Sequence, residues 1–378
     1  MSRGERVLRN ARIVLVDRVI SGSVKIADGE IADIAEGDSA LGDDFGGDFL
    51  IPGLIELHTD HLENHYRPRP GVFWNPAAAL HAHDVQIAGS GITTVFDAVR
   101  IGTSPDVSDM GPHVEKLLGA IAAGRDNDML RADHLVHLRC ELPTMDVVTH
   151  FEDHAHHDFV RMASLMDHTP GQRQFRSIED YKRFYEAGRT AAELESYIAD
   201  RRAEHERYAA PNRAALVALA HERDITLASH DDATLAHIEE AVADGVAIAE
   251  FPTTLEAAAA AHDAGLAILM GAPNVVRGKS HSGNISATDL VRAGLLDVLS
   301  SDYVPFALLQ AAFVLPQRID SMTLPEALAT VTRNPAEAAG LDDRGEIARG
   351  KRADLVRVSV VDDLPVVRMV WREGKRVS

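Results

Sequence analysis

Two histidines and two acids lie within the six residues His58–Glu63 of the segment ELHTDHLENHYRPRP. In an extended strand, alternate side chains point to the same face, so His58 and Asp60 face one way and Thr59 the other. Imidazole and carboxylate ligands together suit zinc, iron or manganese. A single H-x-D is weak by itself, so this prediction of a metal site depends on the residues at the ends of the other strands.

Further histidines and carboxylates come at the ends of later apolar runs. Glu141 ends the run in ADHLVHLRCEL, His230 ends the one in DITLASHD, and Glu250 lies in GVAIAEFPT. Asp302 closes LDVLSSD. Barrel enzymes carry their active residues at the carboxyl ends of the strands. Together with His58 and Asp60, these positions predict one metal centre.

The middle of the chain alternates between strand-like and helical segments. Eight strand-like runs, LIELHT, GITTVFDAV, ADHLVHLRCEL, FVRMASLMD, DITLASHD, GVAIAEFPT, GLAILMGAP and LDVLSSD, are mostly separated by alanine-rich helical stretches. A helix from about Ser177 to Arg223, broken near Pro211, bridges the fourth and fifth runs. This alternation predicts a (β/α)8 barrel of the TIM type. A doubly wound open sheet is the alternative, and the polar residues at the strand ends favour the barrel.

Both ends of the chain are rich in short β-strand patterns. Residues 5–50 and the last forty residues alternate polar and apolar positions between Gly-Asp turns. We expect the two ends to form one small β-sandwich, residues 1–51 plus 340–378, beside a barrel of residues 52–339. The alternative is two unrelated terminal hairpins.

Composition limits the classes of partner. The chain has 378 residues, of which 46% are hydrophobic and 25% charged, as in soluble globular proteins. A net charge of −20 argues against nucleic acid. Cys140 is the only cysteine, which excludes an intrachain disulfide and a thiolate zinc cluster. With no apolar signal core and no run long enough to span a membrane, we expect a cytoplasmic protein.

Cationic residues come after three of the predicted strands. Guanidinium groups bind phosphate oxygens through two parallel hydrogen bonds, and Gly-Ser loops offer backbone N–H groups. The loops therefore predict an anionic substrate, while the alternative for each arginine is a solvated charge or a structural ion pair. The residues assigned to the anion site are Arg67 and Arg69, then Arg173, then Arg277, Lys279, Ser280 and His281. Glu63 is assigned to substrate binding beside them.

Other polar residues are harder to assign. His65 contacts substrate or packs within its own loop, and His168 binds phosphate or supports a metal ligand. His83 and Asp84 fall on a predicted helix, where we expect them at the surface. The His-rich segment HFEDHAHHDF is interpreted as a solvated loop.

Several strings, IPGLIELHTD, GITTVFDA, LASHDD, LSSD and TRNPAEAAGL…GEIARGKRADLV, resemble the amidohydrolase superfamily over nearly the whole length. The resemblance implies a distorted (β/α)8 barrel with a small β domain built from both chain ends. It also implies one or two divalent metal ions, with zinc expected and iron or manganese as alternatives. A homodimer is possible for barrels of this kind.

The resemblance assigns roles to the strand-end residues. His58 and Asp60 match the metal pair of the first strand, and His230 matches the histidine of the fifth. Glu141 takes the place of the bridging ligand, which many relatives supply as a carboxylated lysine. Glu250 stands where the sixth strand usually gives a histidine, so its role as a ligand is open.

Asp302 matches the aspartate of the eighth strand. The family chemistry implies that metal lowers the pKa of a bound water, and that Asp302 accepts its proton. The hydroxide would then attack phosphorus, and the charge of the pyrophosphate leaving group would need to be neutralised.

Longer strings, HTDHLENHYRPRPGVFW, HLRCELP, SLMDHTPGQRQF, EFPTT and GAPNVVRGKSHSGN, resemble the phosphonate-metabolism branch of the superfamily. That branch implies a small phosphorylated sugar phosphonate as substrate, α-D-ribose 1-methylphosphonate 5-triphosphate, hydrolysed to the 5-phosphate and pyrophosphate. One alternative is a C–N amidohydrolase acting on a cyclic amide or N-acyl compound. Another is a non-catalytic barrel that serves as a subunit of an assembly.

Overall fold

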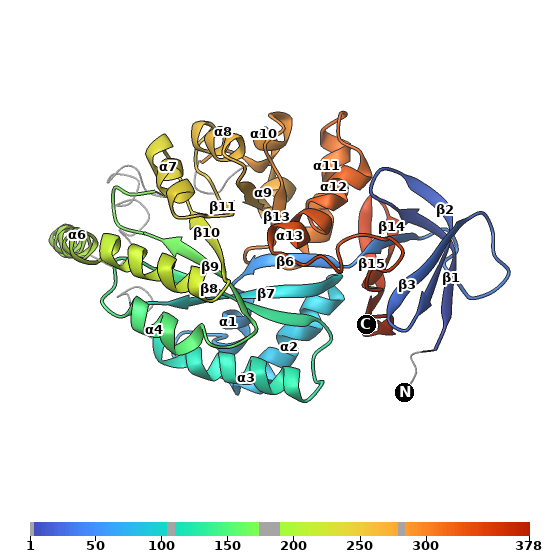
Figure 1. The fold of residues 1–378 in the computed structure, drawn as a ribbon, viewed down its shortest axis with the longest axis horizontal. Coiled ribbons are helices and arrows are strands. Elements are labelled where there is room, and N and C mark those ends of the chain that lie inside the picture. Colours follow the sequence, from blue (N-terminus) through green and yellow to red (C-terminus); the bar gives the residue numbers. More distant parts are fainter. Residues whose placement is uncertain (1–3, 104–109, 174–189, 279–283) are drawn as a thin grey trace.

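The computed structural model describes residues 4–103, 110–173, 190–278 and 284–378. The chain forms two sheets, a large one surrounded by helices and a smaller one at its side (Figure 1).

The large sheet is a barrel. Among the described residues its parallel strands are β6 (Leu54–Thr59), β7 (Ile92–Ile101), β8 (Asp133–Glu141), β9 (Val160–Met166), β10 (Thr226–His230), β11 (Ile248–Glu250), β12 (Ala267–Gly271) and β13 (Val298–Ser300). They pair in chain order. Thr59 and Asp302 form a parallel bridge between the first and last strands. The backbone N–H of Asp302 also donates to the carbonyl of His58 at 3.1 Å. This closure confirms the predicted barrel and excludes the open sheet.

Apolar side chains fill the inside of the barrel. Strands β6, β7 and β9 to β13 contribute buried residues to one cluster, among them Leu57, Phe96 and Met162. Residues at the carboxyl ends lie beyond this layer, so the layer forms the floor on which the polar site is built.

Helices surround the barrel (Figure 1). They are α1 (His61–Tyr66), α2 (Pro76–Gly89), the 3-10 helix η1 (Gly111–His113), α3 (Val114–Asp126), α4 (Val147–His154), α6 (Ala191–Glu222), α7 (Leu235–Ala243), α8 (Leu255–Asp263), α9 (Ala272–Arg277), α10 (Ala287–Arg292), α11 (Ala307–Arg318), α12 (Leu324–Ala329) and α13 (Arg333–Ala338). Several begin at a threonine whose hydroxyl accepts a backbone N–H, as Thr234 and Thr254 do.

The long helix α6 corrects one prediction. It continues through Pro211 without a break. Proline removes one backbone hydrogen bond from a helix interior. The turns on either side keep theirs and bury Leu194, Ile198 and Leu216 against the rest of the protein. The helix begins at Thr190 with a capping box to Glu193, and the predicted start at Ser177 lies outside the described residues.

The small sheet takes strands from both ends of the chain. Its strands are β1 (Arg6–Val14), β2 (Val19–Ala27), β3 (Glu30–Glu36), β4 (Asp43–Asp44), β5 (Phe49–Pro52), β14 (Leu355–Val361), β15 (Leu364–Arg372) and β16 (Lys375–Arg376). The antiparallel pairing of β5 with β14 joins the two ends. A separate core that includes Ile13, Leu50 and Trp371 holds the sheet together. A small β domain from both chain ends is confirmed, and two unrelated hairpins are excluded. The domain limits at 51/52 and 339/340 stay a prediction.

Charged residues join the two units. Asp133, the first residue of β8, lies 2.7 Å from Arg352 and 2.8 Å from Arg344. Arg372 of β15 is 3.3 Å from the same carboxylate. Three guanidinium groups around one aspartate fix the small domain against the amino-terminal end of the barrel. None of the helices in the described part of the chain is both long and apolar enough to cross a membrane.

Candidate metal centre

The carboxyl ends of the barrel strands surround a pocket of about 270 Å³. It is lined by His58, Arg139, His168, His230, Asp231, Phe251, Pro252, Met270, Gly271, Pro273, Asn274, Arg277, Asn284, Ile285, Asp302 and Tyr303. Most of these residues stand at or just after a strand end. Because each strand delivers its terminal side chains to the same end of the barrel, residues far apart in sequence meet here.

Two histidines meet one carboxylate at the bottom of this pocket. Nδ1 of His58 lies 2.9 Å from Oε1 of Glu250, and Nδ1 of His230 lies 3.0 Å from Oε2 of the same group. All three side chains are almost completely buried. Burial lowers the pKa of His58 to about 3 and that of His230 to about 4. Both rings are therefore neutral near pH 7, the form in which a histidine binds metal.

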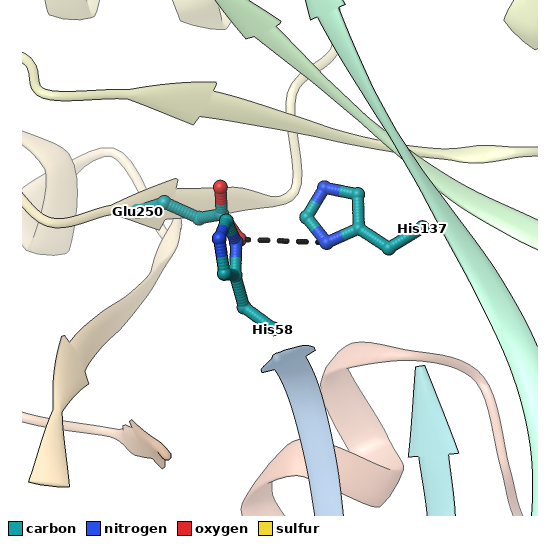
Figure 2. Close-up of side chains that lie close together, drawn as sticks. All are labelled: His58, His137 and Glu250. Carbon is teal, nitrogen blue, oxygen red and sulfur yellow. Dashed lines mark hydrogen bonds and ion pairs between the residues drawn. The ribbon is translucent and has the colours of Figure 1, made fainter. Parts of the chain in front are cut away.

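A third histidine completes this group from strand β8. Nδ1 of His137 is 3.8 Å from Oε1 of Glu250 (Figure 2). The same nitrogen lies 3.0 Å from the backbone carbonyl of Leu57. His137 is fully buried, and its Nε2 has no hydrogen-bond partner. Burial lowers its pKa to about 3.

Carboxylates surround the open side of the histidines. Oδ1 of Asp60 and Oδ2 of Asp231 are buried and lack hydrogen-bond partners. Burial raises the pKa of Asp231 to about 6. Burial, reinforced by the charge of Asp60, raises the pKa of Asp302 to about 7. Unpaired buried oxygens beside neutral imidazoles are a donor set that fits a divalent cation.

Glu141, at the end of β8, is engaged by neighbouring side chains. Its Oε2 lies 2.7 Å from Nδ1 of His168 and 2.5 Å from a guanidinium nitrogen of Arg100. Its Oε1 accepts the backbone N–H of His168 at 3.1 Å. Burial opposes the charge of Glu141, but His168 and Arg100 outweigh it and hold the pKa below its usual range. Glu141 thereby positions His168 at the wall of the pocket.

The backbone turns sharply after three of these strands. Asp231, Phe251 and Asp302 adopt positive φ angles of 56°, 52° and 55°. Aspartate tolerates this region, whereas a bulky residue such as phenylalanine rarely adopts it. Such strained positions concentrate at functional sites, where the surrounding structure holds them.

The predicted anion-binding residues fall into different environments. Arg277, at the end of α9, lines the pocket. Arg173 is 6% exposed and forms ion pairs with Asp232 and, at 3.0 Å, with Glu240. Its guanidinium is therefore paired with carboxylates of the protein itself. The predicted residues Lys279, Ser280 and His281 lie outside the described residues.

The residues predicted after the first strand lie on α1 and the turn beyond it. His65 lies 3.0 Å from the side chain of Gln86 and faces helix α2. Arg67 is half-buried, and Arg69 is exposed in a turn that ends at Val72. None of these lines the described pocket. Glu63 is half-buried, and burial raises the pKa of its carboxyl to about 7.

His83 and Asp84 were expected at the surface, and that prediction is wrong. Both are fully buried. His83 bonds Asp97 of β7 at 2.7 Å, and Asp97 also bonds His134 of β8 at 2.7 Å. Asp84 in turn lies 3.4 Å from His134. These buried polar groups are satisfied by hydrogen bonds to residues on the strands. A solvated helix face would be satisfied by water and would not need such partners.

The His-rich segment HFEDHAHHDF is only partly a loop. Its first half belongs to α4, where Phe151 is buried and His150 and His154 are half-buried. The residues after Ala155 turn into β9. Among the described residues, none of these histidines belongs to a group that could hold a metal ion.

The sequence analysis assigned no role to His137, Arg139 or Asp231, which the structure places beside His58 and His230. His137 and Arg139 alternate with Glu141 on one strand, so a period of two places all three on one face. Considering that period along the whole of LVHLRCEL, instead of only at its terminal acid, would have found them.

The barrel, the small domain and the strand-end residues together define a metal-dependent hydrolase. A family model described as "Amidohydrolase family" matches residues 137–378. The chain belongs to the amidohydrolase family, whose members are generally metal-dependent.

A particular relative is similar over the whole chain. The alpha-D-ribose 1-methylphosphonate 5-triphosphate diphosphatase of Escherichia coli (strain K12) is 47% identical over 376 residues, covering 98% of this chain and 100% of that protein. Among solved structures, 5-methylcytosine deaminase from Klebsiella pneumoniae has a TM-score of 0.64 at 15% identity and covers 98% of both chains. N-acetylglucosamine-6-phosphate deacetylase from Pasteurella multocida has a TM-score of 0.63 at 15% identity and covers 99% of both chains. At this identity the two structures show the fold alone.

Proposed function

We propose that the protein hydrolyses α-D-ribose 1-methylphosphonate 5-triphosphate to the 5-phosphate and pyrophosphate. The observation that carries this proposal is the 47% identity to the diphosphatase of E. coli, which spans both chains almost completely. The reaction adds one water across the bond between the first and second phosphates of the triphosphate. The family resemblance further supports a cytoplasmic enzyme and, as a candidate assembly, a homodimer.

The metal site is assigned to residues at the carboxyl ends of the barrel strands, of which His58 and His230 line the pocket. His58, Asp60 and His230 would hold a divalent ion, and Glu141 and Glu250 are the further donors that the resemblance assigns. Neutral imidazoles with carboxylate oxygens favour zinc, with iron or manganese as alternatives. One or two ions would activate water and neutralise phosphate charge when bound.

Asp302 is the proposed general base. It lines the pocket, and burial raises the pKa of its carboxyl to about 7. A base with a pKa near the working pH combines a useful ionised fraction with enough basicity to take a proton from water. Its backbone is fixed by the bridge to Thr59, so the carboxylate is held against the first strand.

Cationic and amide groups face the pocket from another side. Arg277 and Asn274 of α9 and Asn284 after it all line the pocket. These groups donate hydrogen bonds and fit phosphate oxygens. His168 lies on the pocket wall, where Glu141 fixes its ring, and is the proposed further phosphate contact.

The test measures pyrophosphate released from the ribose triphosphate by metal-reconstituted protein, beside the Asp302→Asn variant. We expect release by the wild-type protein and a loss of at least about 100-fold in kcat for Asp302→Asn, at unchanged metal content. Arg349→Gln, in an exposed ion pair with Asp33, is the control and should keep full activity.

Two results would contradict the proposal. A metal-loaded wild-type protein that releases no pyrophosphate but hydrolyses a cyclic amide would be a C–N amidohydrolase. A protein that takes up no metal would be a non-catalytic barrel.

A further inference from the structure

The pocket contains a basic residue that the assigned metal site and general base do not use. Arg139 lies on β8 between His137 and Glu141, and alternation along the strand puts the three side chains on the same face. Its side chain is 16% exposed and lines the pocket beside His58 and Asp302.

The guanidinium of Arg139 makes only a long ion pair with other described residues. Its ion pair within the described chain is with Asp60, at 3.5 Å between Nη1 and Oδ2, longer than a direct hydrogen bond. Its Nε is buried and has no hydrogen-bond partner. A buried arginine usually satisfies its N–H groups, so the unpaired Nε and the long ion pair of Nη1 favour a ligand.

Other arginines near the site form short ion pairs with carboxylates of the protein. Arg100 bonds Glu141 at 2.5 Å, Arg201 bonds Glu204 at 2.5 Å, and Arg173 pairs with Asp232. Among the described residues, the arginines that line the pocket are Arg139 and Arg277. Of these two, Arg139 is the arginine that pairs with a residue assigned to the metal, Asp60.

The acidic surroundings of the pocket favour a source of positive charge in addition to a bound metal ion. Asp231 and Asp302 line the pocket together with Arg139, and Asp60 lies 3.5 Å from the guanidinium of Arg139. A triphosphate brings several further negative charges into this acidic surrounding. Like charges at close range in a partly buried site repel strongly, so fixed positive charge must oppose them.

We propose that Arg139 is a catalytic residue that binds the phosphate chain and neutralises charge on the pyrophosphate leaving group. This inference rests on the proposed function. When the bond between the first and second phosphates breaks, its electron pair stays on the leaving oxygen. The guanidinium donates two N–H groups to phosphate oxygens there. Arg277 lines the same pocket and supplies a second guanidinium for the phosphate chain.

Binding of inorganic tripolyphosphate, measured by calorimetry on metal-loaded protein, tests the inference without turnover. We expect Arg139→Ala to weaken binding at least about 10-fold, and Arg139→Lys to lie between it and the wild type, because lysine keeps the charge without the fork. Metal content is measured before and after each titration. Arg349→Gln is the control and should bind as the wild type does.

Turnover supplies a second measurement. We expect Arg139→Ala to lower kcat/KM for pyrophosphate release by about 100-fold, and guanidinium ion in the buffer to restore part of it. Equal tripolyphosphate binding by wild type and Arg139→Ala, or no binding by the wild type, would overturn the inference. So would a loss of activity that parallels a loss of metal and does not respond to guanidinium, because Arg139 would then act only by holding Asp60. Wild-type protein that binds tripolyphosphate through Arg139 but releases no pyrophosphate would contradict the proposed function while supporting the anion site.

Discussion

His58 and Glu250 share a 2.9 Å hydrogen bond although 192 residues separate them in sequence. The other oxygen of Glu250 bonds His230 at 3.0 Å, so one carboxylate from β11 contacts a histidine from β6 and another from β10. A carboxylate oxygen accepts, so each Nδ1 donates and each Nε2 stays available to a metal. Carboxylates that orient metal-binding histidines in this way fix the ring and its tautomer.

Glu250→Gln should weaken metal binding without unfolding the protein. The amide keeps one accepting oxygen, but its NH2 group faces the second Nδ1–H and cannot accept from it. One histidine therefore loses its orientation, and we expect metal affinity to fall about 10- to 100-fold. Competition with a chelator of known affinity measures this. A far larger loss would identify Glu250 as a direct ligand, and no loss would remove it from the site.

Arg173→Ala should destabilise the fold. Removing the guanidinium leaves Asp232 buried without its counter-charge, which typically costs about 3–5 kcal/mol. Urea unfolding of Arg173→Ala, Asp232→Asn and the double variant measures the coupling. We expect the double variant to be more stable than Arg173→Ala, since the uncompensated charge is gone. Strictly additive effects would show that the pair does not interact.

The buried network around His134 should make stability depend on pH. Burial opposes protonation of this ring, but Asp97 and Asp84 outweigh it and raise its pKa from 6.5 to about 9. A histidine whose pKa is higher in the folded than in the unfolded protein stabilises the fold at a pH below its unfolded-state pKa. This stabilisation is lost as the pH rises through its folded-state pKa. The shift corresponds to about 3 kcal/mol, present at pH 6.5 and lost above pH 9.

His134→Gln isolates this contribution. Urea midpoints of wild type and variant are compared between pH 6.5 and 9.5, so that groups titrating in both proteins cancel. The stability difference between them should shrink as the pH rises. A difference that stays constant across this range would mean that His134 is not protonated in the folded protein.

Local patterns predicted the barrel and the positions of its polar strand ends. Alternating apolar runs gave the eight strands, and parallel strands in a barrel bring His58, His230 and Asp302 together without further information. The barrel closes where Thr59, at the end of β6, bridges Asp302, which follows β13. These features depend on periodicity and chain order, which a single sequence contains.

The hydrogen-bond and ion-pair partners of individual charged residues could not be predicted in the same way. Arg173 was predicted to bind phosphate, but it bonds Asp232 and Glu240, which lie 59 and 67 residues further along the chain. His83 and Asp84 were expected in solvent, and their partners lie on strands β7 and β8. The partner of each residue depends on which side chain a strand or helix far away in sequence brings into contact with it. The position of a residue on its own helix does not determine that partner.

Asp133→Asn should loosen the small domain from the barrel. The carboxylate of Asp133 faces Arg344, Arg352 and Arg372, and an amide would remove the one negative charge that the three guanidinium groups share. Each arginine keeps a further carboxylate partner, which limits the loss. Because the aspartate is partly exposed, we expect a loss of about 1–3 kcal/mol, smaller than for a fully buried pair. Thermal unfolding combined with limited proteolysis measures it, and cleavage should appear first near the domain junction. Asp17→Asn, at an exposed ion pair in the small domain, is the matched control and should unfold as the wild type does. Unchanged unfolding of Asp133→Asn would mean that apolar contacts, such as those in the cluster that contains Ile92, Val356 and Val370, hold the two units together by themselves.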